Sequence, residues 1–260
     1  MFWKRKKENK PEEEKEPEYN VQFVDLKKIE AFLSVYVGIA VNEHGDYVYY
    51  VLEPTLNPEE IKLLDDVKKY LFEKISYNIN EKEEQVWERM KNLIDSRLKE
   101  LKMTHKSGKV YYYIKRDLLG YGKIDVMLKD EEIEDISCNG PNIPVYIWHR
   151  FYESLPSNVY FSSKEELDSF ILKLAYKSGR TVSFSNPMID ATLPEGHRIQ
   201  ITLGGEVTGR GTNFTIRKFR TDPITIIDLI NFKTITAKLA AYLWIAIERK
   251  MSLLIAGGTA

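Results

Sequence analysis

The chain has 260 residues, of which 43% are hydrophobic and 12% aromatic, enough for an ordinary core in one large or two smaller domains. The formal net charge is −1, so any attraction to nucleic acid or membrane must come from a local patch. A single cysteine, Cys138, excludes an internal disulfide and a cysteine zinc cluster, which favours a reducing compartment such as the cytoplasm.

Residues 1–20 are predicted to be a disordered charged arm. A basic cluster at residues 4–7 is followed by an acidic one at residues 12–14, with prolines at 11 and 17. Phe2 and Trp3 beside the cations allow contact with an anionic lipid surface, and a solvated tail is the alternative. No cleavable apolar segment follows, which argues against a secretory signal. The longest apolar runs elsewhere are far shorter than the roughly 20 residues of a membrane-spanning helix.

Residues 21–105 are predicted to form a hairpin and a helical subdomain. Two segments rich in Val and Tyr, 34–41 and 46–52, flank a turn and indicate paired strands. Asn57-Pro58-Glu59-Glu60 then supplies an N-cap, a proline at the first helical position and a capping glutamate. The apolar spacing predicts one helix to residue 75 and a second over 81–102 that packs on it. The charged faces of both helices are read as solvated surface.

Residues 106–220 are predicted to form a mixed or antiparallel sheet with flanking helices, which makes the fold class α+β. A helix over 109–119 is expected to end near Gly120. Strands are expected over 133–138 and 143–148, on either side of an Asn-Gly-Pro-Asn turn. Ser163 to Glu166 reads as a capping box for a further helix, with Gly179 at its end.

The segment from Leu193 to Phe219 contains two strands of period 2 around a glycine-rich loop. In the first strand Arg198 alternates with apolar residues, and in the second Arg217 does the same. If the strands pair, both arginines emerge on the face opposite the core, and Arg210 is carried on the loop between them. The sequence therefore predicts that three guanidinium groups converge on one surface.

Residues 197–220 include five Arg or Lys residues and only one acid, Glu206. Such a surface suits a polyanion such as a triphosphate. The alternative is ordinary: arginines on the open face of a sheet are usually solvated or paired with carboxylates. Spacing alone leaves both interpretations open.

The C-terminal part is predicted to comprise a linker over 221–235, opening with a linker helix at Asp222-Pro223, and the start of a P-loop α/β domain over 236–260. An apolar helix over 236–249 precedes a buried strand over 251–256. A strand that runs into glycines is how a phosphate-binding loop begins, since backbone N–H groups must approach the phosphates. The residues that start this loop would be Gly257, Gly258 and Thr259. The second glycine, the lysine and the hydroxyl residue of the motif are absent, so we expect this chain not to hydrolyse ATP.

Taken in order, a series of motifs resembles the archaeal branch of the type II/IV secretion ATPases, the hexameric motors of type IV pili, archaella and secretion systems. The resemblance covers residues 110–260 most clearly and 30–105 more loosely. The segments that carry it are Gly120–Asp125, Ile133–Gly140, Pro144–His149, Leu193–Arg198, Glu206–Arg210 and Phe214–Phe219.

The resemblance implies a two-domain subunit in which ATP and Mg²⁺ lie between an α+β N-terminal domain and a P-loop motor domain. It also implies a homo-hexamer in the cytoplasm, at the inner face of the membrane, with a polytopic membrane platform protein as partner. Arginines of the family's N-terminal domain approach the nucleotide phosphates. The matching positions here are Arg198, Arg210 and Arg217.

This sequence also departs from the family. The phosphate-binding lysine, the catalytic glutamate, the Mg²⁺-binding acidic stretch and the histidine motif would all lie past Ala260, so the chain reads as a truncated fragment without a tightly bound cofactor. The tetracysteine metal site of some relatives is missing, the four histidines show no ligand spacing, and no metal site is expected. The apolar helix over 236–249 is expected to pack on another copy or to be partly disordered.

The alternative function is a non-catalytic module that binds nucleic acid or serves assembly. The strip at 197–220 lacks the interleaved aromatic residues on which bases stack, which argues against specific nucleic-acid binding.

Overall fold

The computed structural model describes residues 22–30, 34–75, 83–205, 207–219 and 224–257, so the predicted arm at 1–20 lies outside the described residues. The chain divides into two units, Met1–Phe219 and Arg220–Ala260.

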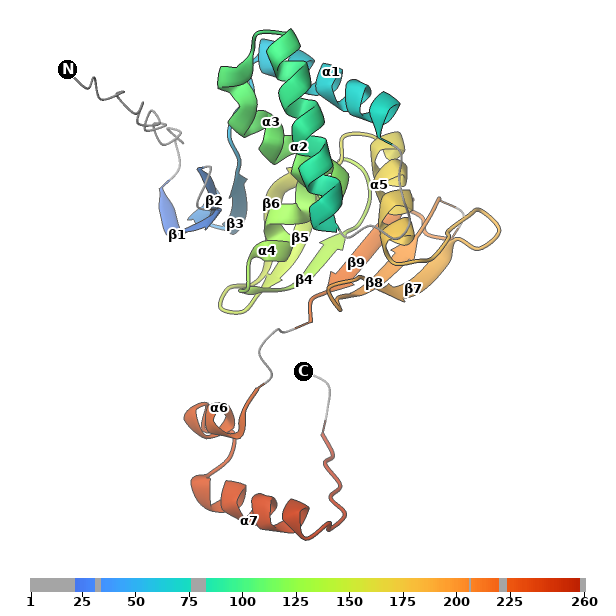
Figure 1. The fold of residues 1–260 in the computed structure, drawn as a ribbon. Helices are drawn as coiled ribbons and strands as arrows, with labels where there is room; N and C mark the ends of the chain where they lie inside the picture. Colours follow the sequence, from blue (N-terminus) through green and yellow to red (C-terminus); the bar gives the residue numbers. More distant parts are fainter. Residues whose placement is uncertain (1–21, 31–33, 76–82, 206, 220–223, 258–260) are drawn as a thin grey trace, which may run out of the picture. The chain divides into compact units, whose positions relative to one another are not determined.

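A nine-stranded mixed sheet runs through the described part of the first unit, as Figure 1 shows. Its strand order is β1-β2-β3-β6-β5-β4-β9-β8-β7, and every neighbouring pair is antiparallel except β3 and β6. The sheet and its helices confirm the predicted α+β class. The strands are β1 (Phe23–Glu30), β2 (Val35–Val41), β3 (Tyr47–Leu52), β4 (Ile133–Cys138), β5 (Pro144–His149), β6 (Glu153–Tyr160), β7 (Met188–Thr192), β8 (Arg198–Thr202) and β9 (Asn213–Arg217).

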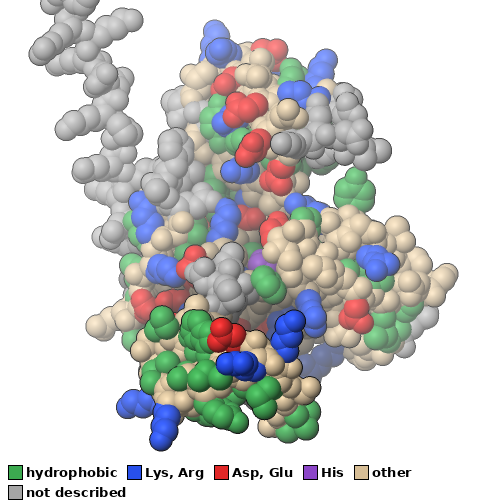
Figure 2. Space-filling view, turned by 60° about the horizontal axis from the view of Figure 1, so that its bottom comes forward, with side chains coloured by type: hydrophobic (Ala, Val, Ile, Leu, Met, Phe, Trp, Pro, Cys, Tyr) green, Lys and Arg blue, Asp and Glu red, His purple; other side chains and the backbone are tan. Residues whose placement is uncertain are grey.

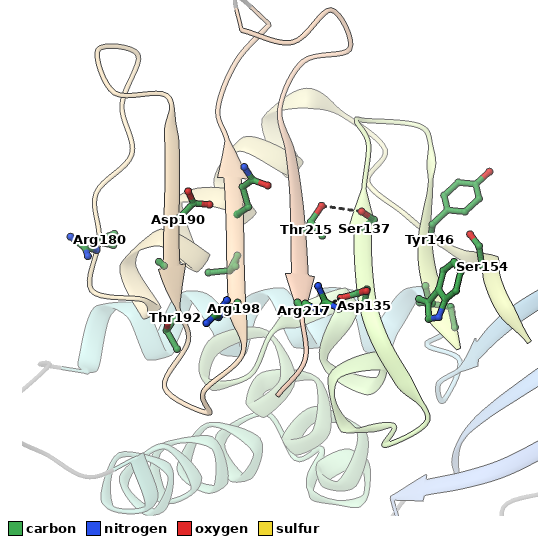
Figure 3. Close-up of a pocket in the computed structure, with 15 residues that line it drawn as sticks. Asp135, Ser137, Tyr146, Ser154, Arg180, Asp190, Thr192, Arg198, Thr215 and Arg217 are labelled. Atoms are coloured by element: carbon green, nitrogen blue, oxygen red, sulfur yellow. Dashed lines mark hydrogen bonds and ion pairs between the residues drawn. The ribbon is translucent and has the colours of Figure 1, made fainter. Parts of the chain in front are cut away.

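The helices of this unit lie on one face of the strands from β4 to β9 (Figures 1 and 3). They are α1 (Pro58–Lys74), α2 (Glu83–Glu100), α3 (Ser107–Ile114), α4 (Asp125–Lys129) and α5 (Lys164–Lys177). A π-helical turn, η2 (Lys115–Leu119), extends α3, and 3₁₀ turns lie at η1 (Thr104–Lys106) and η3 (Gly122–Ile124). Among the described residues, no helix has the length and apolar character needed to cross a membrane.

Local signals in the sequence predicted several helix ends correctly. Asn57 and Glu60 form the predicted capping box of α1, each accepting from the other's backbone N–H. At α5 only half of the predicted box forms: the Ser163 hydroxyl accepts from the backbone N–H of Glu166, but the Glu166 carboxylate accepts from the N–H and hydroxyl of Ser162. The preceding serine offers the carboxylate two donors, which compensates for the missing bond.

The core of the first unit lies between the sheet and its helices. Phe214 of β9 is 1% exposed and packs against Phe161 and Phe170, with ring centroids 6.2 Å and 5.4 Å away. Asp130, also 1% exposed, fixes the β1–β3 end of the sheet, because it accepts from the Tyr49 hydroxyl at 2.8 Å and from the Lys27 ammonium at 3.3 Å. One hydrophobic cluster therefore spans most of the unit, and a buried carboxylate connects its distant strands.

The described part of the second unit consists of α6 (Ile226–Asn231) and α7 (Ala237–Glu248), which begin at the N-caps Thr225 and Thr236. α6 falls inside the predicted linker. The strand predicted over Met251–Ala256 is wrong, because these residues form no strand and are exposed. A strand needs a neighbour for its backbone groups, and the described residues of this unit supply none.

Large hydrophobic side chains lie on the surface of this unit, where Ala240 is the only buried hydrophobic residue among those described (Figure 2). The exposed group includes Phe232, Leu239, Tyr242, Trp244, Ile245, Ile247, Leu253, Leu254 and Ile255. Gly257 is exposed, and Gly258 and Thr259 lie outside the described residues.

Candidate functional site

The face of the sheet away from the helices carries a shallow depression of about 780 Å³, shown in Figure 3. Side chains of six neighbouring strands, β6, β5, β4, β9, β8 and β7, line it. The charged residues of the lining are Asp135, Arg180, Asp190, Arg198 and Arg217.

Strand alternation places the two central arginines. Ile199 pairs with Ile216 on the buried face, and one position away Arg198 pairs directly with Arg217 on the open face. Paired residues in adjacent strands lie about 5 Å apart, so the two side chains start from neighbouring points. This confirms the prediction that both arginines lie on the face opposite the core.

Arg217 is only weakly held by its own protein. Its Nε lies 3.9 Å from a carboxylate oxygen of Asp135, and its side chain is 78% exposed. Ion pairs of this kind contribute about 0–1 kcal/mol, so exchanging the aspartate for a more highly charged ligand costs little. Burial, with a smaller effect from Glu134, raises the pKa of Asp135, while Arg217 acts in the opposite direction.

Arg180 is the third arginine at this depression, and the sequence analysis missed it. It follows α5 directly after Gly179, whose positive φ of 69° turns the chain out of the helix. Figure 3 shows Arg180 next to the outer edge of β7, the strand that carries Asp190. Three arginines and two aspartates therefore give the lining a net charge of +1.

Arg210 lies elsewhere. It belongs to the loop after Thr202, at the end of the strand pair opposite to Arg198, and four residues of strand span about 13 Å. Its backbone packs beside the β4–β5 turn, since a Cβ placed on Gly140 would lie 3.0 Å from the Arg210 carbonyl oxygen. The structure thus brings together two of the three predicted arginines and places the third at the far end.

Two aromatic side chains share the open face with the arginines. Tyr146 and Trp148 of β5 point outward, 36% and 45% exposed, while Val145 before them and Ile147 between them point into the core. The sequence predicted this strand over residues 143–148 without assigning its side chains to faces. Its period of 2 was the signal that would have assigned the two rings to the open face.

No family model matches the chain. It is 36% identical to the uncharacterized protein MJ1288 of Methanocaldococcus jannaschii over 196 residues, which cover 72% of this chain and 78% of that protein. The chain belongs to the same family as MJ1288. Two longer proteins of this organism also match: the uncharacterized proteins MJ0900, 34% identical over 78% of this chain, and MJ0781, 38% identical over 53%. The matched parts span only 36% of MJ0900 and 20% of MJ0781.

Among solved structures, the chain is similar to the VirB11 ATPase from the Brucella suis type IV secretion system in complex with sulphate. The identity is 22%, the alignment covers 47% of this chain and 40% of that chain, and the TM-score is 0.34. A score this low carries no argument about the site.

Proposed function

We propose that the chain is the nucleotide-contacting part of a secretion or pilus-assembly motor ATPase subunit, and that Arg198 and Arg217 bind the phosphates of ATP. The observation that carries the proposal is the direct cross-strand pairing of two exposed guanidinium groups on an open sheet face. Both belong to motifs that resemble the archaeal type II/IV secretion ATPases. The relatives in Methanocaldococcus jannaschii are consistent with an archaeal family and assign it no activity.

The chemistry of the pair fits phosphate. A guanidinium group donates through a planar fork that matches two phosphate oxygens, and two neighbouring forks offset the charge of a triphosphate. In a motor subunit they would neutralise charge that develops on the transferred phosphoryl group and link domain closure to hydrolysis. Arg210, about 13 Å along the strands, would then contact another part of the nucleotide or a neighbouring subunit.

The remaining parts of the proposal rest on the sequence resemblance. In them, Gly257, Gly258 and Thr259 begin the loop that holds ATP and Mg²⁺, and the subunits form a hexamer. The assembly lies in the cytoplasm against the membrane and acts on a polytopic platform protein. No specific nucleic acid takes part.

Binding of a non-hydrolysable ATP analogue with Mg²⁺ tests the arginine pair. We expect Arg198→Ala and Arg217→Ala each to weaken binding about 10-fold or more, the size of a lost charge-assisted hydrogen bond. Arg150→Ala is the matched control, because its Nε lies 3.8 Å from Glu134 of β4, as that of Arg217 lies 3.9 Å from Asp135. Equal affinities for the wild type and the three variants, or no binding to any of them, would contradict the proposal that these arginines bind phosphate.

A second function is favoured by the outward rings of Tyr146 and Trp148. An aromatic pair on the same open face as Arg198 and Arg217 is the combination used to bind single-stranded nucleic acid. Titration of an oligonucleotide at several salt concentrations separates the two functions. Affinity that falls steeply with salt and is lost in Trp148→Leu would favour nucleic acid.

A further inference from the structure

A second cavity of about 780 Å³ lies on the helix-covered side of the first unit. Its walls come from α2, α3, η2, α4, the end of α5 and the turn between β7 and β8. Two of the motifs singled out in the sequence, Gly120–Asp125 and Leu193–Arg198, meet here, because the Tyr121 hydroxyl donates to the Glu195 carboxylate at 2.5 Å. The arginine pair on the open face contributes nothing to this lining.

Aromatic rings form a large part of the wall. Trp87 of α2 and Tyr111 of α3 meet edge to face with their centroids 6.2 Å apart, and Tyr112 and Tyr121 line the same space. A volume of this size suits a small organic molecule, and rings of this kind provide flat apolar contact surface.

Ammonium groups lie against these rings. The Lys115 ammonium is 5.7 Å from the centre of Trp87, and that of Lys177 is 4.7 Å from the centre of Tyr121. Lys177 also donates to the Leu119 carbonyl, and Lys173, one turn earlier on α5, donates to the Asp117 carbonyl at 2.6 Å. Burial, followed by the charge of Lys177, lowers the pKa of Lys173 to about 8.

Two carboxylates of the wall already have donors. Asp125 accepts from the backbone N–H of Tyr121 at 2.8 Å and pairs with Lys129 at 2.9 Å, and Glu195 accepts from the Tyr121 hydroxyl. A third, Glu83, is exposed at the start of α2. The carboxylate acceptors inside the cavity are therefore largely used, whereas ammonium donors remain for a bound molecule.

We propose that this cavity binds a planar aromatic anion, with its ring against the aromatic wall and its negative group at Lys115 and Lys177. Both a nucleotide and a simple aromatic phosphate have this chemistry. The site stands independently of the proposed function, because its residues and the arginine pair lie on opposite faces of the sheet.

Calorimetric titration of the full chain with phenyl phosphate and with adenosine monophosphate tests the site. We expect at least one of them to bind, with adenosine and inorganic phosphate at least 10-fold weaker, since each lacks one half of the recognised chemistry. Phenyl phosphate alone would indicate a small aromatic ligand, and adenosine monophosphate alone a nucleotide. Failure of both to bind would overturn the proposal.

Variants then locate the binding. Lys115→Met and Lys177→Met should each weaken it about 10-fold, and Arg217→Met, on the other face, should leave it unchanged. The reverse pattern would overturn the cavity site while supporting the arginine pair. Lys177→Met also loses the hydrogen bond to the Leu119 carbonyl, which can change the local structure. A second measurement therefore uses the wild-type chain. Bound ligand should protect Lys115 and Lys177 from acylation read by peptide mass spectrometry, but not Lys62, which is exposed on α1 and lines neither cavity. Equal labelling with and without ligand would contradict the proposal.

Discussion

Neighbouring basic residues at the ends of β8 and β9 have opposite environments. Arg217 points to the open face and is 78% exposed, whereas the next residue, Lys218, points to the helices and donates to the carbonyls of Met127 and Asp130. Burial lowers the pKa of Lys218 to about 8. In the same way, burial and then the charge of Lys218 lower the pKa of His197, which precedes the exposed Arg198. Lys218 and His197 are thus part of the fold, while Arg198 and Arg217 remain available to a ligand.

Because the covered face holds the core, we expect the largest effect on stability from a substitution at Phe214. Its ring is 1% exposed among Phe161 and Phe170, so Phe214→Ala should lower the free energy of unfolding by about 3–5 kcal/mol. Chemical denaturation measures it. The neighbouring Thr215→Ala on the open face is the control, and similar losses for both would contradict the assignment of the two faces.

The two aspartates provide the next comparison. Asp130→Ala leaves the buried Tyr49 hydroxyl without its acceptor and should cost about 2–3 kcal/mol of unfolding free energy. Asp135→Ala removes a long, exposed pair with Arg217, and we expect a change of at most about 1 kcal/mol of either sign. Thermal and urea unfolding of both variants measure the two losses. A larger loss for Asp135→Ala than for Asp130→Ala would contradict the account.

Lys218 should make stability depend on pH. Its pKa is about 8 in the folded chain and near 10.4 in the unfolded chain, so between these values the unfolded state binds more protons and stability rises with pH. Below pH 8 this contribution is constant. We expect the wild type to gain about 2 kcal/mol more than Lys218→Met between pH 8 and 10.4. Arg217→Met should retain the wild-type gain, and an equal gain in all three proteins would refute the assignment.

A smaller effect on stability is expected at the hydrogen bond that links the two motifs at the second cavity. Tyr121→Phe removes the hydrogen bond to Glu195 and should cost about 1 kcal/mol of unfolding free energy. Arg198→Ala and Arg217→Ala should change stability by less, within about 0.5 kcal/mol, because their side chains are exposed. Urea unfolding of the three variants checks this order.

Short-range signals explain what the sequence predicted correctly. The hairpin of β2 and β3, the cap at Asn57 and the alternation in β8 and β9 depend on neighbours in the chain. Strands β1, β6 and β7 were missed although each forms a hairpin with a strand next to it in the chain. Each buries two residues or fewer among those described, which leaves little apolar pattern to detect, and Pro156 interrupts that of β6. The link from Asp130 to Tyr49 joins residues 81 positions apart, which no local pattern encodes.

The candidate site was predicted in part. Strand alternation alone predicted that Arg198 and Arg217 share the open face, but Arg180 comes from a different segment, after α5. The distance of Arg210 from the pair follows from topology. Arg198 is the first residue of β8 and Arg217 is the last residue of β9, so both lie at one end of this antiparallel pair, and the loop with Arg210 connects the strands at the other end. The predicted strand over 251–256 failed because an apolar run becomes a strand only beside a partner.

The most direct test of the arginine pair is how affinity depends on the number of phosphates. Affinities for the mono-, di- and non-hydrolysable triphosphate forms of adenosine should be measured with Mg²⁺ on the wild type and on the double variant Arg198→Ala/Arg217→Ala. The account predicts that wild-type affinity rises with each phosphate and that the double variant loses this rise, whatever affinity it keeps for the monophosphate at the second cavity. A rise of the same size in both proteins would contradict it.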